Sequence, residues 1–378
     1  MAVSRRGMIL GIGGAAALVA AGGVWRVMRR PAQALAPWDL DPEPLADVRL
    51  DAFRHAILAP NPHNRQPWLI RLDGADEATI FCDLDRRLPM TDPFDRQITI
   101  GFGCFLETAR IAAAERGVAL AINPFPEGSE GARLDQRPVA ALRFAAMPDV
   151  PRDPLFAQIP HRRSNKEVYA DRDVAPDMLA SLAGAQESLR MEATAEPARV
   201  AAIRAQVLEA LATETATPRT HKESIDLVRI GAREVDANPD GIDLTGPGIE
   251  VMAALGLLTR EAMLDPTSQA SRQAEQILMA TYGSAPAYWW LVTDTNDRAS
   301  QLAAGAAYVR ANLKATELGL SMHPASQALQ EYPEVGPNFE RIHALLAPEG
   351  GRVQMLARVG HGPAIPPSPR FPLESKRV

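Results

Sequence analysis

Three cations surround one hydroxyl in the segment 162–166, which reads Arg-Arg-Ser-Asn-Lys. Alternate residues of an extended chain point to the same side, so Arg162, Ser164 and Lys166 would share one face. Two cations and a hydroxyl on one face suit a phosphate monoester, because they neutralise its charge and donate directional hydrogen bonds. The alternative is a solvated basic turn ahead of a helix, which is how most short runs of Arg and Lys behave.

A second polar segment, residues 59–68, reads Ala-Pro-Asn-Pro-His-Asn-Arg-Gln-Pro-Trp. Pro60 and Pro67 fix the backbone at both ends. Asn64 and Gln66 supply amides that both donate and accept hydrogen bonds, which suits the pyrimidine edge of a flavin. The alternative is a loop held in shape by an Asx-turn, with its tryptophan packed in the core.

The two segments gain specificity beside the C-terminal stretch 360–370, which begins Gly-His-Gly-Pro and ends Pro-Pro-Ser-Pro-Arg. Together the three stretches resemble the nitroreductase family of FMN-binding oxidoreductases, and within it the Acg-like branch, in which two nitroreductase-type domains are fused. Segment 162–166 matches the family's Arg-x-Ser-x-Lys/Arg phosphate motif, and segment 59–68 matches its Ala-Pro-Ser-x-x-Asn-x-Gln-Pro-Trp loop. Arg370 matches an arginine that also reaches the phosphate. The likeness covers about residues 45–375.

The resemblance implies FMN as the cofactor, with the flavin rather than a side chain carrying the chemistry. In this family each flavin lies at a dimer interface, with its phosphate on one subunit and the Asn-x-Gln-Pro-Trp loop on the other. Here the loop lies in the first half of the chain and the phosphate motif in the second, so we expect one FMN per chain. The implied contacts are Arg162, Ser164, Lys166 and Arg370 at the phosphate, Pro60, Asn61 and Asn64 beside the ring, and Pro324, Ser326 and Gln327 near N5.

The chain departs from the family at residues 324–327, where Pro-Ala-Ser-Gln replaces the usual Pro-x-Glu-Gly. A long insertion, about residues 213–284, could also cap the flavin and exclude a nicotinamide. One function left open is an FMN-dependent oxidoreductase that passes electrons from NAD(P)H or another donor to a nitroaromatic or quinone-like acceptor. Another is a catalytically silent flavin-binding or storage protein whose lid covers FMN. A third is a scaffold without a cofactor.

The expected fold is α+β, with two tandem nitroreductase-like domains at 45–150 and 155–378. Each is expected to have helices packed on a mainly antiparallel sheet. Two glycine-ended helices, 101–117 and 303–319, align without gaps, so that Gly103 matches Gly305. This alignment favours internal duplication and hence a monomer that forms an internal pseudo-dimer. Strands are expected at 68–72, 79–84, 119–122, 139–144, 288–293 and 353–359, and further helices at 45–58, 176–189 and 197–212.

The N-terminus resembles a twin-arginine export signal, with Ser4-Arg5-Arg6 directly before an apolar segment. The uncharged run 7–25 is long enough to span a bilayer as a helix. We therefore predict that residues 1–36 are an export signal or a retained membrane anchor, with a candidate peptidase site at 32–34. The protein is then expected in the periplasm or on the membrane, with the twin-arginine export machinery as a partner.

The composition narrows the remaining classes of function. A net charge of −6 without a long basic run argues against nucleic acid as a partner. Cys82 and Cys104 lie outside any Cys-x-x-Cys pair, and no His/Cys cluster has the spacing of a zinc site. We expect both cysteines to be small buried apolar side chains, and no metal site.

Overall fold

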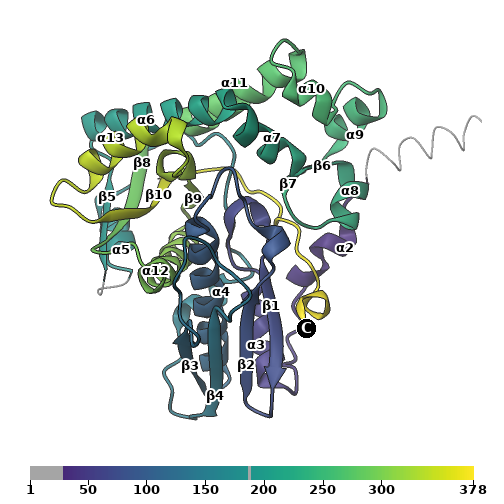
Figure 1. Cartoon of the computed structure of the whole chain (residues 1–378), viewed down its shortest axis with the longest axis vertical. Coiled ribbons are helices and arrows are strands. Elements are labelled where there is room, and N and C mark those ends of the chain that lie inside the picture. The colour runs from purple at the N-terminus through teal and green to yellow at the C-terminus, as the bar shows by residue number, and fades with distance from the viewer. Residues whose placement is uncertain (1–28, 186–188) are drawn as a thin grey trace, which may run out of the picture.

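The computed structural model describes residues 29–185 and 189–378, which contain two four-stranded antiparallel sheets (Figure 1). Their strand orders are β1-β2-β4-β3 and β5-β8-β10-β9, so both sheets have the same connectivity. This architecture confirms the predicted α+β class and its tandem arrangement. The strands are β1 (Trp68–Asp73), β2 (Glu77–Cys82), β3 (Val118–Pro124), β4 (Ala140–Ala146), β5 (Arg190–Thr194), β8 (Ala287–Thr293), β9 (Ser321–Pro324) and β10 (Arg352–Gly360).

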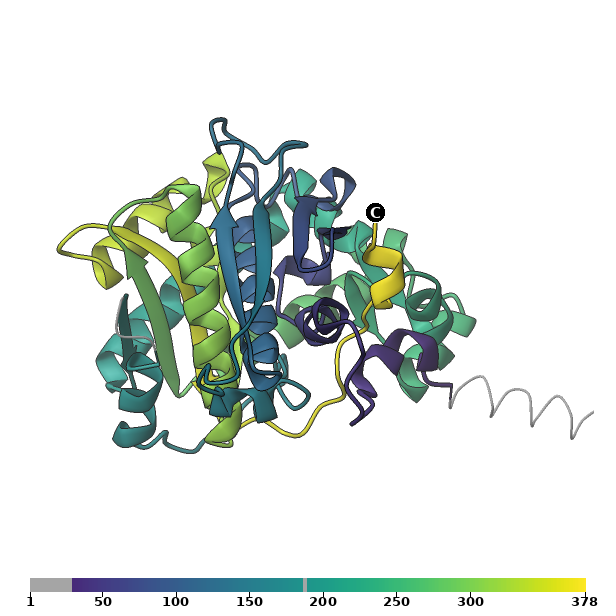
Figure 2. The ribbon, with the colours of Figure 1, turned by 90° about the horizontal axis from the view of Figure 1, so that it is seen from below.

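Two long helices, α4 (Arg96–Glu115) and α12 (Arg298–Glu317), pack against each other between the sheets (Figure 2). In chain order, α4 connects β2 to β3, and α12 connects β8 to β9. Gly103 and Gly305, the pair aligned from the sequence, meet at this contact, where a Cβ on either residue would collide with a backbone carbonyl of the other helix. The aligned glycines therefore mark the axis of an internal pseudo-dimer.

The first residue of each long helix reaches into the other half of the molecule. Arg96 donates to the carbonyl oxygens of Leu329 (2.7 Å) and Gln354 (2.8 Å) in the second half. Arg298 donates to the hydroxyl of Thr99 (3.1 Å) in the first half. This reciprocity binds the two halves into one folded body.

The second sheet is covered on both faces, which explains its apolar central strand. Every residue of β8 is buried. Trp289 donates its indole N–H to Leu182 O of α5 (Pro176–Ala183), and Trp290 donates to Leu346 O of α13 (Gly336–Leu346), each over 3.2 Å. Successive side chains of a strand point to opposite faces, so these two helices lie on opposite sides of the sheet.

The predicted elements are present, with shifted ends. The helix expected at 101–117 already begins at Arg96, and the one expected at 176–189 ends at Ala183. In the first half, α3 (Val48–Ala56) begins where the Asp47 carboxylate accepts from the Arg49 amide. The short strands β5 and β9 were not predicted, because neither shows a clear alternation of apolar residues. Cys82 and Cys104 are both buried, and neither forms a disulfide, as expected.

The insertion forms a helical layer over one end of the two sheets (Figure 1). It has its own small core of Ile225, Val228 and Met263. Its two short strands pair in parallel, unlike those of the main sheets. From α6 (Pro197–Ala216) onward the elements are α7 (Pro218–Asp226), β6 (Val228–Ile230), α8 (Gly231–Ala237), β7 (Ile242–Leu244), α9 (Pro247–Ala254), α10 (Arg260–Leu264) and α11 (Gln269–Gly283).

Both ends of the described chain are fastened to distant parts. The N-terminal helix α2 (Ala32–Leu35) includes the buried Ala34, whose carbonyl accepts from the Arg370 amide. The candidate peptidase site at 32–34 is thus part of the folded body. At the other end, Arg377 pairs in parallel with Ile70 of β1, so the C-terminal tail closes onto the first domain.

The predicted twin arginine and the apolar run 7–25 lie outside the described residues. Among residues 29–185 and 189–378, no helix is long and apolar enough to cross a membrane.

Candidate functional site

Two buried arginines from distant parts of the chain meet at one backbone oxygen. Arg162 donates to Leu58 O over 3.0 Å, and Arg370 donates to the same oxygen over 3.1 Å. Arg370 also donates to Ala59 O over 3.2 Å. Their exposed fractions are 4% and 2%. The structure therefore brings together two of the predicted phosphate residues, directly beside the loop 59–68.

Within the described residues, these two guanidinium groups donate only to neutral oxygens. The described residues form no ion pair with either arginine; instead, Arg162 donates to Asn312 Oδ1 (3.0 Å) and Arg370 to Asn64 Oδ1 (2.7 Å). Burial lowers the pKa of Arg162 to about 10 and holds the pKa of Arg370 well below its ordinary value. Arg370 Nε is buried and makes no hydrogen bond. Buried cations with an unused donor indicate a site for an anion.

The rest of the phosphate motif runs beside β9. Ser164 forms a parallel bridge with Met322 of β9. Lys166, two residues further along, is exposed, whereas Arg162 is buried. Lys166 nevertheless lies near both halves of the site. Together with burial, its charge lowers the pKa of His63 in the first domain, to about 4, and that of His323 in β9. The two motifs predicted from the sequence are thus neighbours in space.

Three residues of the loop 59–68 are held in an unusual backbone conformation. His63, Asn64 and Gln66 all have positive φ, at 45°, 51° and 49°. Side chains rarely adopt this region without compensating bonds. The Gln66 side chain provides two of them: it donates to Pro239 O over 2.7 Å, and its oxygen accepts from the Phe371 amide over 2.9 Å. The loop is therefore shaped in part by the insertion and the C-terminal tail.

The loop amides predicted beside a ring are engaged with protein groups. Asn64 donates to Pro369 O (2.8 Å) in addition to accepting from Arg370. Asn61 Oδ1 accepts from the Gln66 amide, five residues further along (2.7 Å), so it holds the loop in shape but does not form an Asx-turn. Pro60, which precedes both, is buried. Contact of these residues with a flavin stays a prediction, and their observed role is to hold the loop.

Residues 324–327 follow directly from the strand that pairs with the phosphate motif. Pro324 ends β9, and its carbonyl accepts from the Tyr282 hydroxyl over 3.3 Å. Ser326 and Gln327 begin a 3-10 turn, Ser326–Leu329. Gln327 Oε1 is buried and accepts no hydrogen bond in this structure. An acceptor with free capacity therefore lies where the resemblance implies the flavin N5 region.

Sequence reasoning missed Arg358, which organises the phosphate segment from β10. This fully buried arginine donates to the carbonyls of Asn165 (2.9 Å) and Glu167 (2.8 Å) and to His323 Nδ1 (3.0 Å). Its guanidinium also stacks over Tyr169, 3.9 Å from the ring centroid. An arginine within the otherwise apolar run 355–360 was the available signal. The Leu58 carbonyl, in contrast, has no sequence signature.

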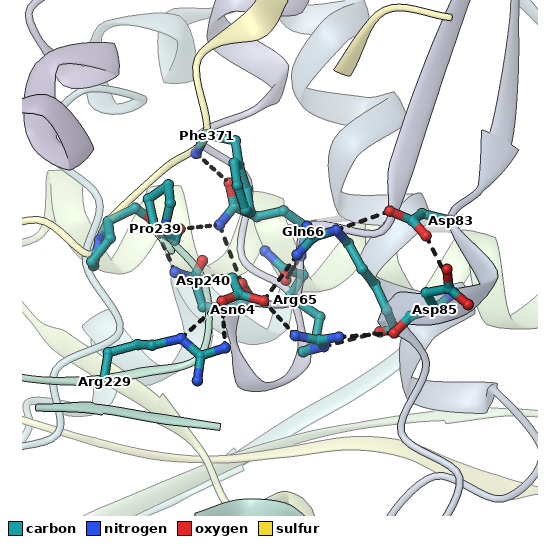
Figure 3. Close-up of polar contacts among 12 residues, drawn as sticks. Asn64, Arg65, Gln66, Asp83, Asp85, Arg229, Pro239, Asp240 and Phe371 are labelled. Atoms are coloured by element: carbon teal, nitrogen blue, oxygen red, sulfur yellow. Dashed lines mark hydrogen bonds and ion pairs between the residues drawn. The ribbon is translucent and has the colours of Figure 1, made fainter. Parts of the chain in front are cut away.

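The insertion is fastened to the loop through one carboxylate (Figure 3). Asp240 pairs with Arg65 of the loop, with Arg86 (2.9 Å) and with Arg229 of the insertion (2.7 Å). The adjacent Pro239 carbonyl is the one that accepts from Gln66. A further insertion carboxylate, Asp243, feels the charges of Lys166 and Arg370, although burial raises its pKa overall. The insertion therefore packs against the loop 59–68 through Arg65 and Gln66.

No protein-family model matches the chain. The chain is 28% identical over 332 residues to the putative NAD(P)H nitroreductase Rv3131 of Mycobacterium tuberculosis H37Rv, which covers 83% of this chain and 86% of that protein. It is 35% identical over 89 residues to the putative NAD(P)H nitroreductase acg of the same strain, covering 23% and 26%.

Solved structures give more distant likenesses. A putative nitroreductase from Anabaena variabilis is 12% identical, with a TM-score of 0.41 over 87% of this chain and 91% of that one. The FMN-dependent nitroreductase NfnB from Mycobacterium smegmatis, in complex with NADPH, is 18% identical, with a TM-score of 0.37 over 58% and 94%.

Proposed function

Because the chain belongs to the nitroreductase family and resembles its Acg-like members, we propose that it is an FMN-dependent oxidoreductase with one flavin between its two domains. Electrons would come from a reduced nicotinamide or another donor and pass to a nitroaromatic or quinone-like acceptor. The relatives' names support the nicotinamide, since both are described as NAD(P)H nitroreductases.

The observation that carries the proposal is the pair Arg162 and Arg370. Burying two guanidinium groups side by side costs free energy unless an anion compensates them. Within the described residues their hydrogen-bond acceptors are all neutral oxygens, and the Asp243 carboxylate acts on Arg370 without forming an ion pair. A phosphate monoester provides a compensating charge and acceptors for the unused Arg370 Nε. Arg163, whose Nε is also buried without a partner, adds a third cation next in sequence. The site therefore fits the phosphate end of FMN.

The chain's own residues would bind and orient the cofactor. Arg162, Ser164 and Arg370 would hold the phosphate, and exposed Lys166 would close it from the side of β9. The residues beyond β9, with the free acceptor of Gln327, would face the polar edge of the ring. Bound FMN supplies the two-electron chemistry, and the protein supplies position and electrostatics.

One structural feature favours a second candidate, a flavin-binding or storage protein without turnover. The Asp240 carboxylate holds the insertion against the first domain through Arg65 of the loop and through Arg86. Such a closure would keep a nicotinamide from the flavin while leaving the phosphate site intact. The two candidates share the cofactor and differ only in access to it.

The deciding experiment is the visible absorption spectrum of the purified full-length protein, before and after anaerobic addition of NADPH. We expect a yellow protein with one FMN per chain that bleaches with NADPH. A yellow protein that does not bleach would support the storage function. A colourless protein that also fails to take up added FMN would overturn both candidates and leave the scaffold.

We also propose that the chain is exported by the twin-arginine route and remains a monomer, its two domains taking the place of two subunits. The motif Ser4-Arg5-Arg6 ahead of the apolar run supports export. The close backbone approach of the two helices at Gly103 and Gly305 supports the internal pseudo-dimer. Fractionation of cells and the mass of the purified protein in solution test the two statements separately.

A further inference from the structure

Exposed apolar side chains gather on the insertion. Of the eleven large apolar residues that are exposed in the described part of the chain, five lie between 251 and 278. Scattered single residues of this kind are ordinary, whereas a group of neighbours points to a binding surface. Three of the five lie in or directly after α9, and we refer to these as the apolar end of the insertion: Val251 (42% exposed), Leu255 (67%) and Leu257 (63%).

Local structure presents the two most exposed leucines to the outside. Gly256 adopts φ 70° after the end of α9, and a Cβ at this glycine would meet no atom within 4 Å. The turn therefore projects Leu255 and Leu257, on either side of the glycine, away from the protein. Figure 1 shows α9 and α10 at the end of the insertion remote from both sheets, whereas α11 runs back toward α6. These side chains add nothing to the core and have no role in the site between the domains.

The start of the described chain lies against this same end of the insertion. Arg29 Nη2 lies 3.4 Å from Asp236 Oδ2 of α8, and the amides of Gln33 and Ala34 donate to Asp236 Oδ1, each over 3.1 Å. Arg29 also lines a groove of about 710 Å³ whose other walls include Ala253 of α9 and residues 258–261. The described chain therefore begins beside α8 and α9.

Only a short stretch of chain separates Arg29 from the uncharged run 7–25. The uncharged run ends at Trp25, only four residues before Arg29. Four residues of fully extended chain reach at most about 14 Å. If the run 7–25 spans a bilayer, the groove and α9 must lie within that distance of the bilayer surface. The insertion is then the part of the molecule that faces the lipid.

The net charge of the insertion indicates which lipid headgroups it can approach. Between residues 213 and 284, acidic side chains outnumber basic ones by eleven to six. Such a surface is repelled by anionic lipid, so contact would rest on apolar burial in a bilayer of neutral headgroups. Arg26, Arg29 and Arg30 suit the headgroup layer at the end of the spanning segment.

We propose that the apolar end of the insertion docks on the surface of the same bilayer that holds residues 7–25. The bilayer is of neutral phospholipid, and Leu255 and Leu257 enter its interfacial layer. This inference rests on retention of the N-terminal segment as an anchor and is independent of FMN binding.

The test uses the full-length chain in phosphatidylcholine vesicles, with Leu257→Cys carrying an environment-sensitive fluorophore. The native cysteines are buried, so labelling is selective. Met147→Cys, at an exposed position (49%) of the first domain, is the matched control. Lipids with a nitroxide near the headgroup should quench the label at 257 at least fivefold more than at 147, and the label at 257 should shift to the blue.

Three outcomes would overturn the proposal. Equal quenching at 257 and 147 would show that the insertion does not face the lipid. A blue shift that depends on protein concentration and not on nitroxide lipid would assign the apolar end to a second copy. Failure of the chain to float with vesicles would remove the anchor itself. FMN content measured on the same samples keeps these results separate from the proposed function.

Discussion

Gly103 of α4 and Gly305 of α12 lie so close that a Cβ on either would strike the backbone of the other helix, at Leu302 O and Ile100 O respectively. These carbonyls belong to helices and cannot swing aside as a flexible side chain would. The contact lets the two longest helices approach at the centre of the molecule, and each domain supplies one glycine. The stability of the internal pseudo-dimer should therefore depend on both.

Gly305→Ala should lower the free energy of unfolding by about 3 kcal/mol or more, since overpacking against backbone forces the helices apart. Urea denaturation measures the change. Gly248→Ala is the matched control, because Gly248 also lies in a helix and its added Cβ meets nothing within 4 Å. Alanine should there be neutral or stabilising by up to about 1 kcal/mol. Equal effects of the two variants would contradict the close contact.

Arg370→Gln should weaken FMN binding by about ten- to a hundredfold, the loss of one or two charge-assisted hydrogen bonds at about 1.5–3 kcal/mol each. Quenching of flavin fluorescence during titration of the flavin-free protein gives the affinity. Arg137→Gln removes an arginine from the surface of the first domain, where it pairs with Glu130 and Asp135. This control should bind FMN like the parent chain. Unchanged affinity in Arg370→Gln would place the phosphate elsewhere.

Asp240→Asn should release the insertion from the loop, because the amide cannot compensate Arg65, Arg86 and Arg229 together. We expect faster cleavage of the segment 226–246 in limited proteolysis and at least a threefold faster anaerobic bleaching by NADPH. Asp265→Asn is the control, since Asp265 lies in the insertion and its carboxylate bonds only locally, to Thr267.

The two readouts of Asp240→Asn separate the candidate functions. Faster proteolysis together with faster bleaching means that the insertion limits access in an active enzyme. Faster proteolysis without any bleaching means that access is not what prevents turnover.

Lys376 should make stability depend on pH above neutrality. It is buried, donates to Gln66 O over 2.7 Å and has no carboxylate partner among the described residues; burial lowers its pKa to about 7. Between about pH 7 and its ordinary value the unfolded chain then binds more protons, so stability rises with pH. Relative to Lys376→Met, the parent chain should gain about 2 kcal/mol between pH 7 and pH 9.

Urea unfolding of both chains at the two pH values measures this difference. Lys222→Met, at an exposed lysine paired with Asp226, should show no such change with pH. A parallel pH response of the parent chain and Lys376→Met would show that Lys376 stays charged in the folded protein.

Much of the fold could be predicted from local pattern. Residues 288–293 form the buried central strand β8 because an apolar run must be covered on both faces. The alignment of Gly103 with Gly305 predicted the duplication, and the shared strand order confirms it. The strands β5 and β9 escaped prediction because each is short and is defined by the neighbour it pairs with, not by its own residues.

The sequence by itself determined the residue types of the site: the motif 162–166, the loop 59–68 and Arg370 were all named from spacing and resemblance. Only the tertiary structure decided what those residues do. It placed Arg162 and Arg370 on the Leu58 carbonyl, turned Asn64 toward Arg370, and set Asp240 against the loop. The physical reason is that every residue carries the same backbone carbonyl, so hydrogen-bond partners depend on which distant segment folding brings within 3 Å or so.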